Sequence, residues 1–198
     1  MKKQVIEHFR KVDTVLYQAL GQISPVTASH THDYFSDLCE TIVSQQLSGK
    51  AGETIWQRFI ALFPDKHVSA ETLLSFSDGK IRAIGTSRSK VIYLKNLAVH
   101  VRNRSLVLDR LPDMPDREVV DRLTELKGIG PWTAEMFLMF SLGREDVFSF
   151  GDLGLRNAIK KLYKFKKEPT RKQMEKLSAR WAPYRTWAAR ILWRSLEL

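Results

Sequence analysis

Apolar residues recur at helical spacing along almost the whole chain, and hardly any segment alternates between apolar and polar residues as a strand would. Leu94, Leu97 and Val101, for example, lie three or four positions apart, which places them on one face of a helix. Such stretches are separated by Ser, Thr, Asp, Gly and Pro, the residues that begin and end helices. The pattern predicts an all-α fold of about ten helices.

Several helix ends are predicted from capping residues. The first twenty residues are expected to form one amphipathic helix, followed by a loop over residues 21–32. Asp33 and Asp152 are each expected to cap a helix, and Thr170 with Gln173 forms a capping-box pattern. Further helices are expected over residues 49–63, 69–76, 78–85, 87–103, from 115, over 131–142 and from 184.

Composition narrows the class of protein. A chain of 198 residues forms one large domain or two small, closely packed ones. Its single cysteine, Cys39, excludes an internal disulfide and a four-cysteine cluster, and its five histidines form no metal-binding pattern. No secretory signal and no membrane-spanning stretch are expected. These features favour a cytoplasmic protein without a cofactor.

Charge points to a polyanionic partner. The chain has 32 Lys and Arg against 22 Asp and Glu, a net charge of +10, which favours polyanionic partners and nucleic acid first. A membrane is not expected as a partner, because no stretch of the sequence is long and apolar enough to span one. The segment from Lys161 to Lys167 alone carries four lysines and no acid. A merely basic protein remains the alternative at this point.

The sharpest local motif is the turn between Leu126 and Ala134. Gly128 and Gly130 permit positive φ and a close approach of another backbone, while Ile129 between them is expected to plug into the core. Pro131 suits the first turn of a new helix, whose free N–H groups form an anion site matched to a DNA phosphate. A tight connection between two helices is the alternative.

The full run resembles the helix-hairpin-helix (HhH-GPD) DNA glycosylase superfamily. Within it, the chain most resembles bacterial 3-methyladenine DNA glycosylase II and its yeast relatives. The matching segments are residues 42–48, 126–134, 146–152 and 181–185. The resemblance implies a monofunctional base-excision-repair enzyme that flips alkylated purines out of damaged duplex DNA and acts as a monomer.

The resemblance also implies the domain plan. It places a six-helix domain over residues 34–142 and a second helical domain over 1–33 and 143–198, with an active-site cleft between them. The N-terminal β domain of the bacterial enzyme is not expected. The family further suggests a monovalent cation held by hairpin carbonyls.

Asp152 is the catalytic candidate, because the superfamily places an aspartate about twenty residues beyond the hairpin. A fixed carboxylate stabilises the cationic sugar that forms as the glycosidic bond breaks. A helix cap alone is the alternative, although a capping position also favours the charged carboxylate. Asp146 is second choice. Where bifunctional relatives carry a Schiff-base lysine this chain has Trp132, so no amine nucleophile is available there.

The remaining site residues fall into three groups. Trp132, then Tyr184, is expected to form an aromatic wall for the cationic base, whereas Trp181, Trp187 and Trp193 are expected in the core. The turn Gln45–Gln46–Leu47 matches the family's wedge, with Gln46 the first choice to fill the gap left by the base, and an ordinary helix end is the alternative. The expected DNA contacts are Gln45, Gln46, Leu47, Arg88, Lys90, Lys127, Gly128, Ile129, Gly130 and Thr133.

Two other functions remain open. One is a related glycosylase for another base, such as hypoxanthine or uracil, because Tyr184 replaces a tryptophan of the bacterial enzyme. The other is a non-catalytic module that only grips the DNA backbone, for which Asp152 would not matter to any chemistry.

Overall fold

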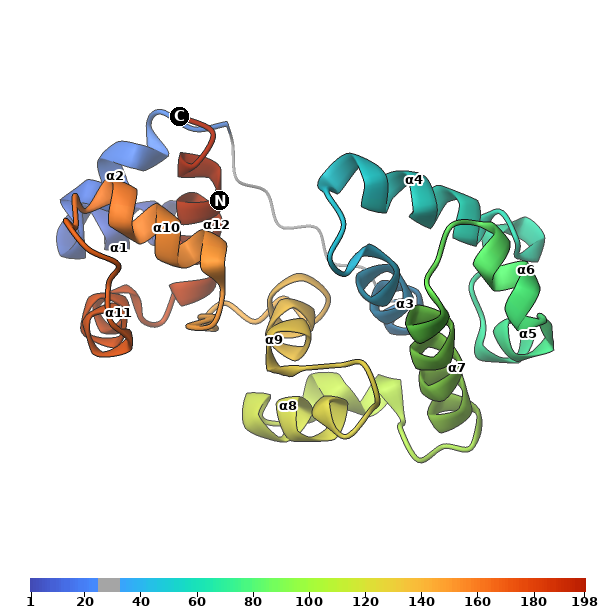
Figure 1. Cartoon of the computed structure of the whole chain (residues 1–198). Helices are drawn as coiled ribbons and strands as arrows, with labels where there is room; N and C mark the ends of the chain where they lie inside the picture. The colour runs from blue at the N-terminus through green and yellow to red at the C-terminus, as the bar shows by residue number, and fades with distance from the viewer. Residues whose placement is uncertain (25–32) are drawn as a thin grey trace. The chain divides into compact units, whose positions relative to one another are not determined.

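The computed structural model describes residues 1–24 and 33–198, so most of the loop predicted over 21–32 lies outside the described residues. Every regular element among them is a helix, which confirms the all-α prediction (Figure 1). Backbone contacts divide the chain into two compact units, Met1–His30 with Leu138–Leu198, and Thr31–Phe137. The division falls inside α9 (Pro131–Phe140). The domain limits expected from the resemblance stay a prediction.

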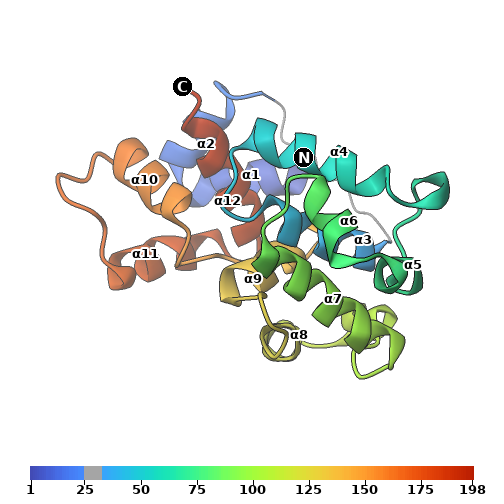
Figure 2. The same ribbon diagram turned by 45° about the vertical axis from the view of Figure 1, so that its right-hand side comes forward.

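The first unit is built from both ends of the chain. Helix α12 packs against α10 and α2, and α1 packs against α2 (Figures 1 and 2). Phe9, Leu16 and Trp181 are fully buried at its centre. Its elements are α1 (Lys3–Val12), α2 (Thr14–Leu20), α10 (Leu153–Leu162), α11 (Arg171–Ser178), a 3-10 turn (Ala179–Trp181) and α12 (Arg185–Ser195).

One predicted helix is two. The expectation of a single helix over the first twenty residues is wrong, because Asp13 is extended (φ −154°) and caps α2 by accepting from the N–H of Leu16. The other oxygen of this buried carboxylate accepts from the Tyr163 hydroxyl at 2.7 Å and from the Trp181 indole at 2.8 Å. Tertiary bonds to a buried carboxylate therefore outweigh the local helical pattern.

The second unit centres on α7 (Arg88–Arg102), which packs against α3, α5 and α6. Val91, Leu94 and Leu97 bury the apolar face that the sequence pattern predicts. The remaining elements are α3 (Tyr34–Ser44), α4 (Gly49–Ile60), a 3-10 turn (Pro64–Lys66), α5 (Ala70–Ser75), α6 (Asp78–Ala83), a 3-10 segment (Leu108–Asp113) and α8 (Asp116–Thr124).

Short polar side chains cap several helices of the described chain, and three of these caps, Asp33, Asp152 and Thr170, are predicted from the sequence. Asp33 accepts from the N–H of Ser36 at the start of α3, and Ser87 does the same for Lys90 at the start of α7. Thr170 and Gln173 form the predicted capping box of α11. These short polar side chains satisfy N–H groups that a helix leaves unpaired in its first turn.

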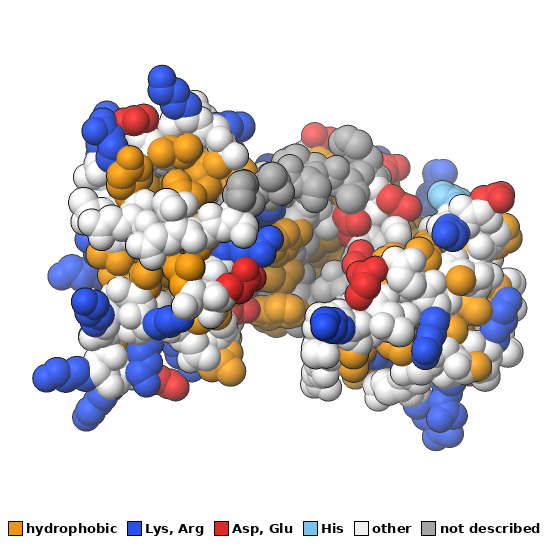
Figure 3. Space-filling view, turned by 90° about the horizontal axis from the view of Figure 1, so that it is seen from above, with side chains coloured by type: hydrophobic (Ala, Val, Ile, Leu, Met, Phe, Trp, Pro, Cys, Tyr) orange, Lys and Arg blue, Asp and Glu red, His pale blue; other side chains and the backbone are white. Residues whose placement is uncertain are grey.

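The face seen in Figure 3 carries basic side chains together with hydrophobic and acidic ones. Within the described part of the chain, no helix combines the length and the apolar character needed to cross a lipid bilayer.

The Asp13 network yields a stability prediction. We expect Asp13→Ala to lower the free energy of unfolding by about 2 to 4 kcal/mol. The substitution leaves the Tyr163 hydroxyl and the Trp181 indole without their acceptor and removes the cap of α2. Asp33→Ala is the matched control, because Asp33 is exposed and caps α3 alone, and should cost about 1 kcal/mol. Urea denaturation measures both. Equal losses would contradict the assigned network.

Candidate active site

Asp152 lies at the N-cap of α10, as the sequence predicts. Only 9% of the residue is exposed, and its Oδ1 accepts from the N–H of Leu155 at 2.7 Å. The same oxygen accepts from the indole Nε1 of Trp193, on α12, at 3.0 Å. The carboxylate is therefore held by its own helix and by a neighbouring one, which fixes its direction.

Gly154 makes room for this arrangement. A Cβ at Gly154 would lie 3.0 Å from the Oδ1 of Asp152 and 3.2 Å from the Trp193 indole. Both distances are tighter than ordinary van der Waals contact, so a side chain there would push the indole and the carboxylate apart. Glycine in the first turn of α10 thus serves the carboxylate geometry.

Trp193 is the site residue that the sequence interpretation missed. Trp181 and Trp187 are buried as predicted, but the core assignment of Trp193 is wrong, because it is half-buried and bonded to Asp152. Trp187 and Trp193 are six residues apart, a rotation of about 240° on a helix, so the two indoles face different ways. This spacing in the sequence could have indicated that Trp193 does not share the buried face of Trp187.

Trp193 is itself held by aromatic contacts. Its ring stacks on Phe140, with centroids 5.9 Å apart and an interplanar angle of 29°. The Arg190 guanidinium lies over the Phe140 ring at 4.5 Å and donates to the carbonyl of Met139 at 2.9 Å. Burial lowers the pKa of Arg190, but an arginine remains charged and retains its attraction to the ring.

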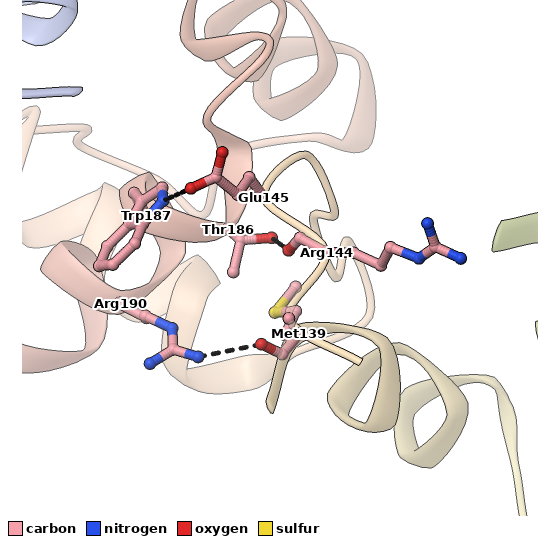
Figure 4. Close-up of a pocket in the computed structure, with 7 residues that line it drawn as sticks. Met139, Arg144, Glu145, Thr186, Trp187 and Arg190 are labelled. Atoms are coloured by element: carbon pink, nitrogen blue, oxygen red, sulfur yellow. Dashed lines mark hydrogen bonds between the residues drawn. The ribbon is translucent and has the colours of Figure 1, made fainter. Parts of the chain in front are cut away.

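The loop that leads to Asp152 is tied to α12 (Figure 4). Thr186 donates from its hydroxyl to the carbonyl of Arg144 at 2.6 Å, and the Trp187 indole donates to Glu145 at 3.1 Å. Figure 4 shows these residues around a small pocket within the first unit. The pocket is lined by Met139, Gly143, Arg144, Glu145, Thr186, Trp187 and Arg190. These bonds give the chain a fixed path into Asp152.

Asp146, the second catalytic choice, belongs to the same attachment. It forms a two-point ion pair with Arg185, with Nε–Oδ1 at 2.7 Å and Nη2–Oδ2 at 2.8 Å. Burial alone would raise the pKa of Asp146, but the hydrogen bonds and charge of Arg185 outweigh it and lower that pKa. Neighbouring Tyr184 is half-buried, and its ring meets His8 edge to face at 5.2 Å.

The glycine turn in the second unit has the predicted positive φ at Gly128 but not at Gly130. Gly128 has φ +92°, and a Cβ there would lie 2.1 Å from the Tyr93 ring. Ile129 is buried, as expected, whereas nothing lies within 4 Å of where a Cβ of Gly130 would be. The backbone N–H of Lys127 donates to the Asn96 side chain at 3.0 Å. One side of the turn is packed tightly and the Gly130 side is open.

Gln45 joins the predicted wedge turn to the hairpin. Its amide donates to the carbonyl of Gly128 at 2.9 Å and to the hydroxyl of Thr133 at 3.4 Å. Gln46 is exposed with φ +59°, and Leu47 is 40% exposed. The structure thus brings Gln45, Gly128 and Thr133 together and leaves the two wedge candidates projecting. Their contacts with DNA stay a prediction, as do those of the hairpin residues.

Arg88 and Lys90 differ in their surroundings. Arg88 is exposed, whereas Lys90 is half-buried and donates to the carbonyl of Val43, near the end of α3, at 2.7 Å. Burial lowers the pKa of Lys90. Lys90 therefore satisfies a helix-end carbonyl.

Trp132, in the first turn of α9, exposes 43% of its surface, which is unusual for an indole.

Known proteins resemble this chain over most of its length. The family described as HhH-GPD superfamily base excision DNA repair protein matches residues 39–183. DNA-3-methyladenine glycosylase 1 of Schizosaccharomyces pombe is 33% identical over 185 residues, covering 92% of this chain and 81% of the relative. DNA-3-methyladenine glycosylase of Saccharomyces cerevisiae is 36% identical over 199 residues, covering 82% and 66%.

Solved structures agree. The S. pombe 3-methyladenine DNA glycosylase in complex with abasic DNA has a TM-score of 0.88 at 31% identity, over 99% of this chain and 98% of that one. A DNA-3-methyladenine glycosidase from Bacillus halodurans has a TM-score of 0.83 at 36% identity, over 97% and 88%. The chain therefore belongs to the HhH-GPD superfamily of base excision DNA repair proteins. Its resemblance to 3-methyladenine DNA glycosylases, predicted from the motifs, is confirmed.

The hairpin offers a matched pair of variants. We expect Gly128→Ala to lower the free energy of unfolding by about 2 to 4 kcal/mol, from left-handed strain and overlap with Tyr93. Gly130→Ala meets open space and should change it by less than about 1 kcal/mol. Denaturant titration compares the two. If Gly128→Ala were as stable as Gly130→Ala, the assigned packing of the turn would be wrong.

Proposed function

We propose that this chain is a monofunctional DNA glycosylase that hydrolyses the N-glycosidic bond of alkylated purines, 3-methyladenine and 7-methylguanine, in duplex DNA. The observation that carries the proposal is the buried Asp152 carboxylate, held by the Leu155 N–H and the Trp193 indole, in a chain of the HhH-GPD superfamily. The relatives named as 3-methyladenine glycosylases support the same activity.

Asp152 acts on the positive charge that develops in the sugar. As the bond from C1′ to the purine nitrogen breaks, its electron pair leaves with the alkylated base, which becomes neutral. The remaining sugar is cationic, and a preorganised carboxylate stabilises it without needing to reorganise. A water molecule then adds to C1′ and gives up a proton, for which Asp152 orients it or accepts the proton. The products are the free base and an abasic site.

Alkylated purines are a suitable substrate class for this constellation. They are cationic, so they attract an electron-rich ring and leave readily without further protonation. The exposed indole of Trp132 is the proposed wall for the flipped base, with Tyr184 next. Trp132 also occupies the position at which the resemblance expects the lysine of bifunctional relatives, so strand cleavage through a Schiff base is not expected.

The second unit supplies the proposed grip on DNA. The turn from Lys127 to Gly130 and the first turn of α9 present N–H groups that suit a backbone phosphate. Gln46, with Leu47 beside it, would fill the gap left by the flipped base. A monovalent cation on the hairpin carbonyls, one of which (Gly128) also accepts from Gln45, would add positive charge beside that phosphate.

A DNA substrate also indicates the location of the protein in the cell. We expect it to act as a monomer in the cytoplasm, on the nucleoid if the source is bacterial. Its net charge of +10 favours residence on DNA.

The activity is tested by base release from duplexes that carry 7-methylguanine, 3-methyladenine, hypoxanthine or uracil, with abasic sites revealed by hot alkali. We expect alkali-dependent cleavage of alkylated duplexes, and a loss of at least about a hundredfold for Asp152→Asn. Asparagine still caps a helix, so the fold should survive. Asp33→Asn, the same change at the cap of α3, is the control and should retain full activity.

Each outcome of this assay has a meaning. The lesion released fastest identifies the base preference, so hypoxanthine or uracil as the best substrate would contradict an alkylpurine enzyme. DNA binding without release from any duplex would contradict the enzyme and leave a backbone-gripping module. Cleavage without alkali would contradict monofunctional chemistry.

Trp193 gives a second prediction, as a positioning residue that acts through Asp152. Trp193→Phe keeps a ring to stack on Phe140 but removes the N–H, so the single-turnover rate of base release should fall about tenfold. Affinity for DNA should not change. In the Asp152→Asn background the same substitution should have no further effect, because interacting groups are not additive. Additive losses would show that Trp193 acts elsewhere.

A further inference from the structure

The positive charge of this chain is concentrated in one stretch of the first unit. Between Arg156 and Arg180 there are ten Lys and Arg against two acids, a net charge of +8, where the whole chain has +10. The stretch includes α11 and most of α10. In the space-filling view, basic side chains are spread over the face that is shown (Figure 3).

At the centre of this stretch are the last turn of α10 and the turn that follows it, here together named the lysine turn. They carry Lys161, Lys164, Lys166 and Lys167. All four residues are exposed. The two acids of the stretch form ion pairs with arginines, Glu168 with Arg156 at 3.8 Å and Glu175 with Arg171 at 2.8 Å. Among the described residues no ion pair holds the four lysines. Their charges are therefore available to a ligand.

The fold does not need these charges. Backbone bonds close the turn, with the N–H of Tyr163 donating to Ile159 at 2.9 Å and that of Phe165 to Lys160 at 3.0 Å. The capping box of Thr170 starts α11 without help from a lysine. Lys164 even has φ +55°, a left-handed conformation at the end of a helix where glycine is the favoured residue. A lysine at this position adds charge at some expense in backbone strain.

The lysine turn lies on the same helix as the catalytic candidate. Asp152 caps the N-terminus of α10, and the lysine turn lies at the C-terminal end of the same helix. Ten helical residues rise about 15 Å. Duplex DNA repeats about every 34 Å along its axis, so the distance from Asp152 to the lysine turn is less than half of one repeat. A duplex carries one charge per about 1.7 Å of axis, a dense match for a cluster of lysines.

We propose that the lysine turn is a second phosphate-binding surface, which contacts the DNA backbone on the flank of the damaged nucleotide. The inference rests on the proposed function for its duplex substrate, but it concerns binding and not base release. Lysines bind phosphates as point charges without reading sequence, so the contact is independent of sequence and sensitive to salt.

The test uses the full chain and an undamaged duplex of about 30 base pairs, with affinity measured by fluorescence anisotropy across a range of salt. The variant is Lys161→Gln with Lys166→Gln and Lys167→Gln. Its control is Lys3→Gln with Lys11→Gln and Lys66→Gln, three exposed lysines outside the stretch, so both proteins lose the same charge. We expect the first variant to reduce the slope of log affinity against log salt by about 2 to 3, and affinity about tenfold, and the control to change little.

Equal slopes for the two triple variants would overturn the proposal, as would tighter binding of single-stranded RNA than of duplex DNA by the wild type. Base release at saturating enzyme should be the same for variant and wild type, because the surface does not touch the reacting atoms. If the wild type released no base, the proposed function would fail while the binding comparison still stood.

Lys164→Gly separates charge from folding. Glycine relieves the left-handed strain, so the variant should be at least as stable as the wild type while binding duplex DNA several-fold more weakly. If a stable Lys164→Gly protein bound duplex DNA with unchanged affinity, Lys164 would not be part of the proposed phosphate-binding surface.

Discussion

The geometry of the candidate site in the first unit depends on the need to hold one buried carboxylate, that of Asp152. A carboxyl group removed from water must have fixed donors, or its burial is costly. For Asp152 these donors are the first turn of α10 and the indole of Trp193, and Gly154 allows the two to meet on one oxygen. Behind the indole, the Phe140 ring and the Arg190 guanidinium form a stack. A carboxylate held from two helices is suited to meet a positive charge without first moving.

The second unit depends on a different constraint, the close approach of backbone in a glycine turn. Gly128 leaves room for the Tyr93 ring, and its carbonyl accepts from Gln45, so the turn is fixed both to α7 and to the segment that follows α3. The hairpin turn and the predicted wedge turn are thus joined through the hydrogen bonds of Gln45. If both turns contact DNA as proposed, this link would keep the backbone contact and the inserted side chain in register.

Much of this was predictable from local chemistry. Helix caps at Asp33, Ser87, Asp152 and Thr170 follow from side chains that reach their own backbone, and the buried Ile129 follows from the glycines on each side. What depends on partners far apart in sequence was not predictable. Asp13 breaks a helix because Tyr163 and Trp181 lie beside it. Trp193 looked like a core residue because the sequence does not show that Asp152 lies within hydrogen-bond distance.

The most direct test of the central claim compares two uncleavable duplexes, one with a cationic pyrrolidine in place of the damaged nucleoside and one with a neutral tetrahydrofuran. If Asp152 stabilises positive charge on the sugar, the wild type should prefer the cationic analogue by at least about a hundredfold, as expected of a transition-state mimic, and Asp152→Asn should lose most of that preference. An equal preference in wild type and variant would mean that the carboxylate caps α10 and does nothing for the charge on the sugar.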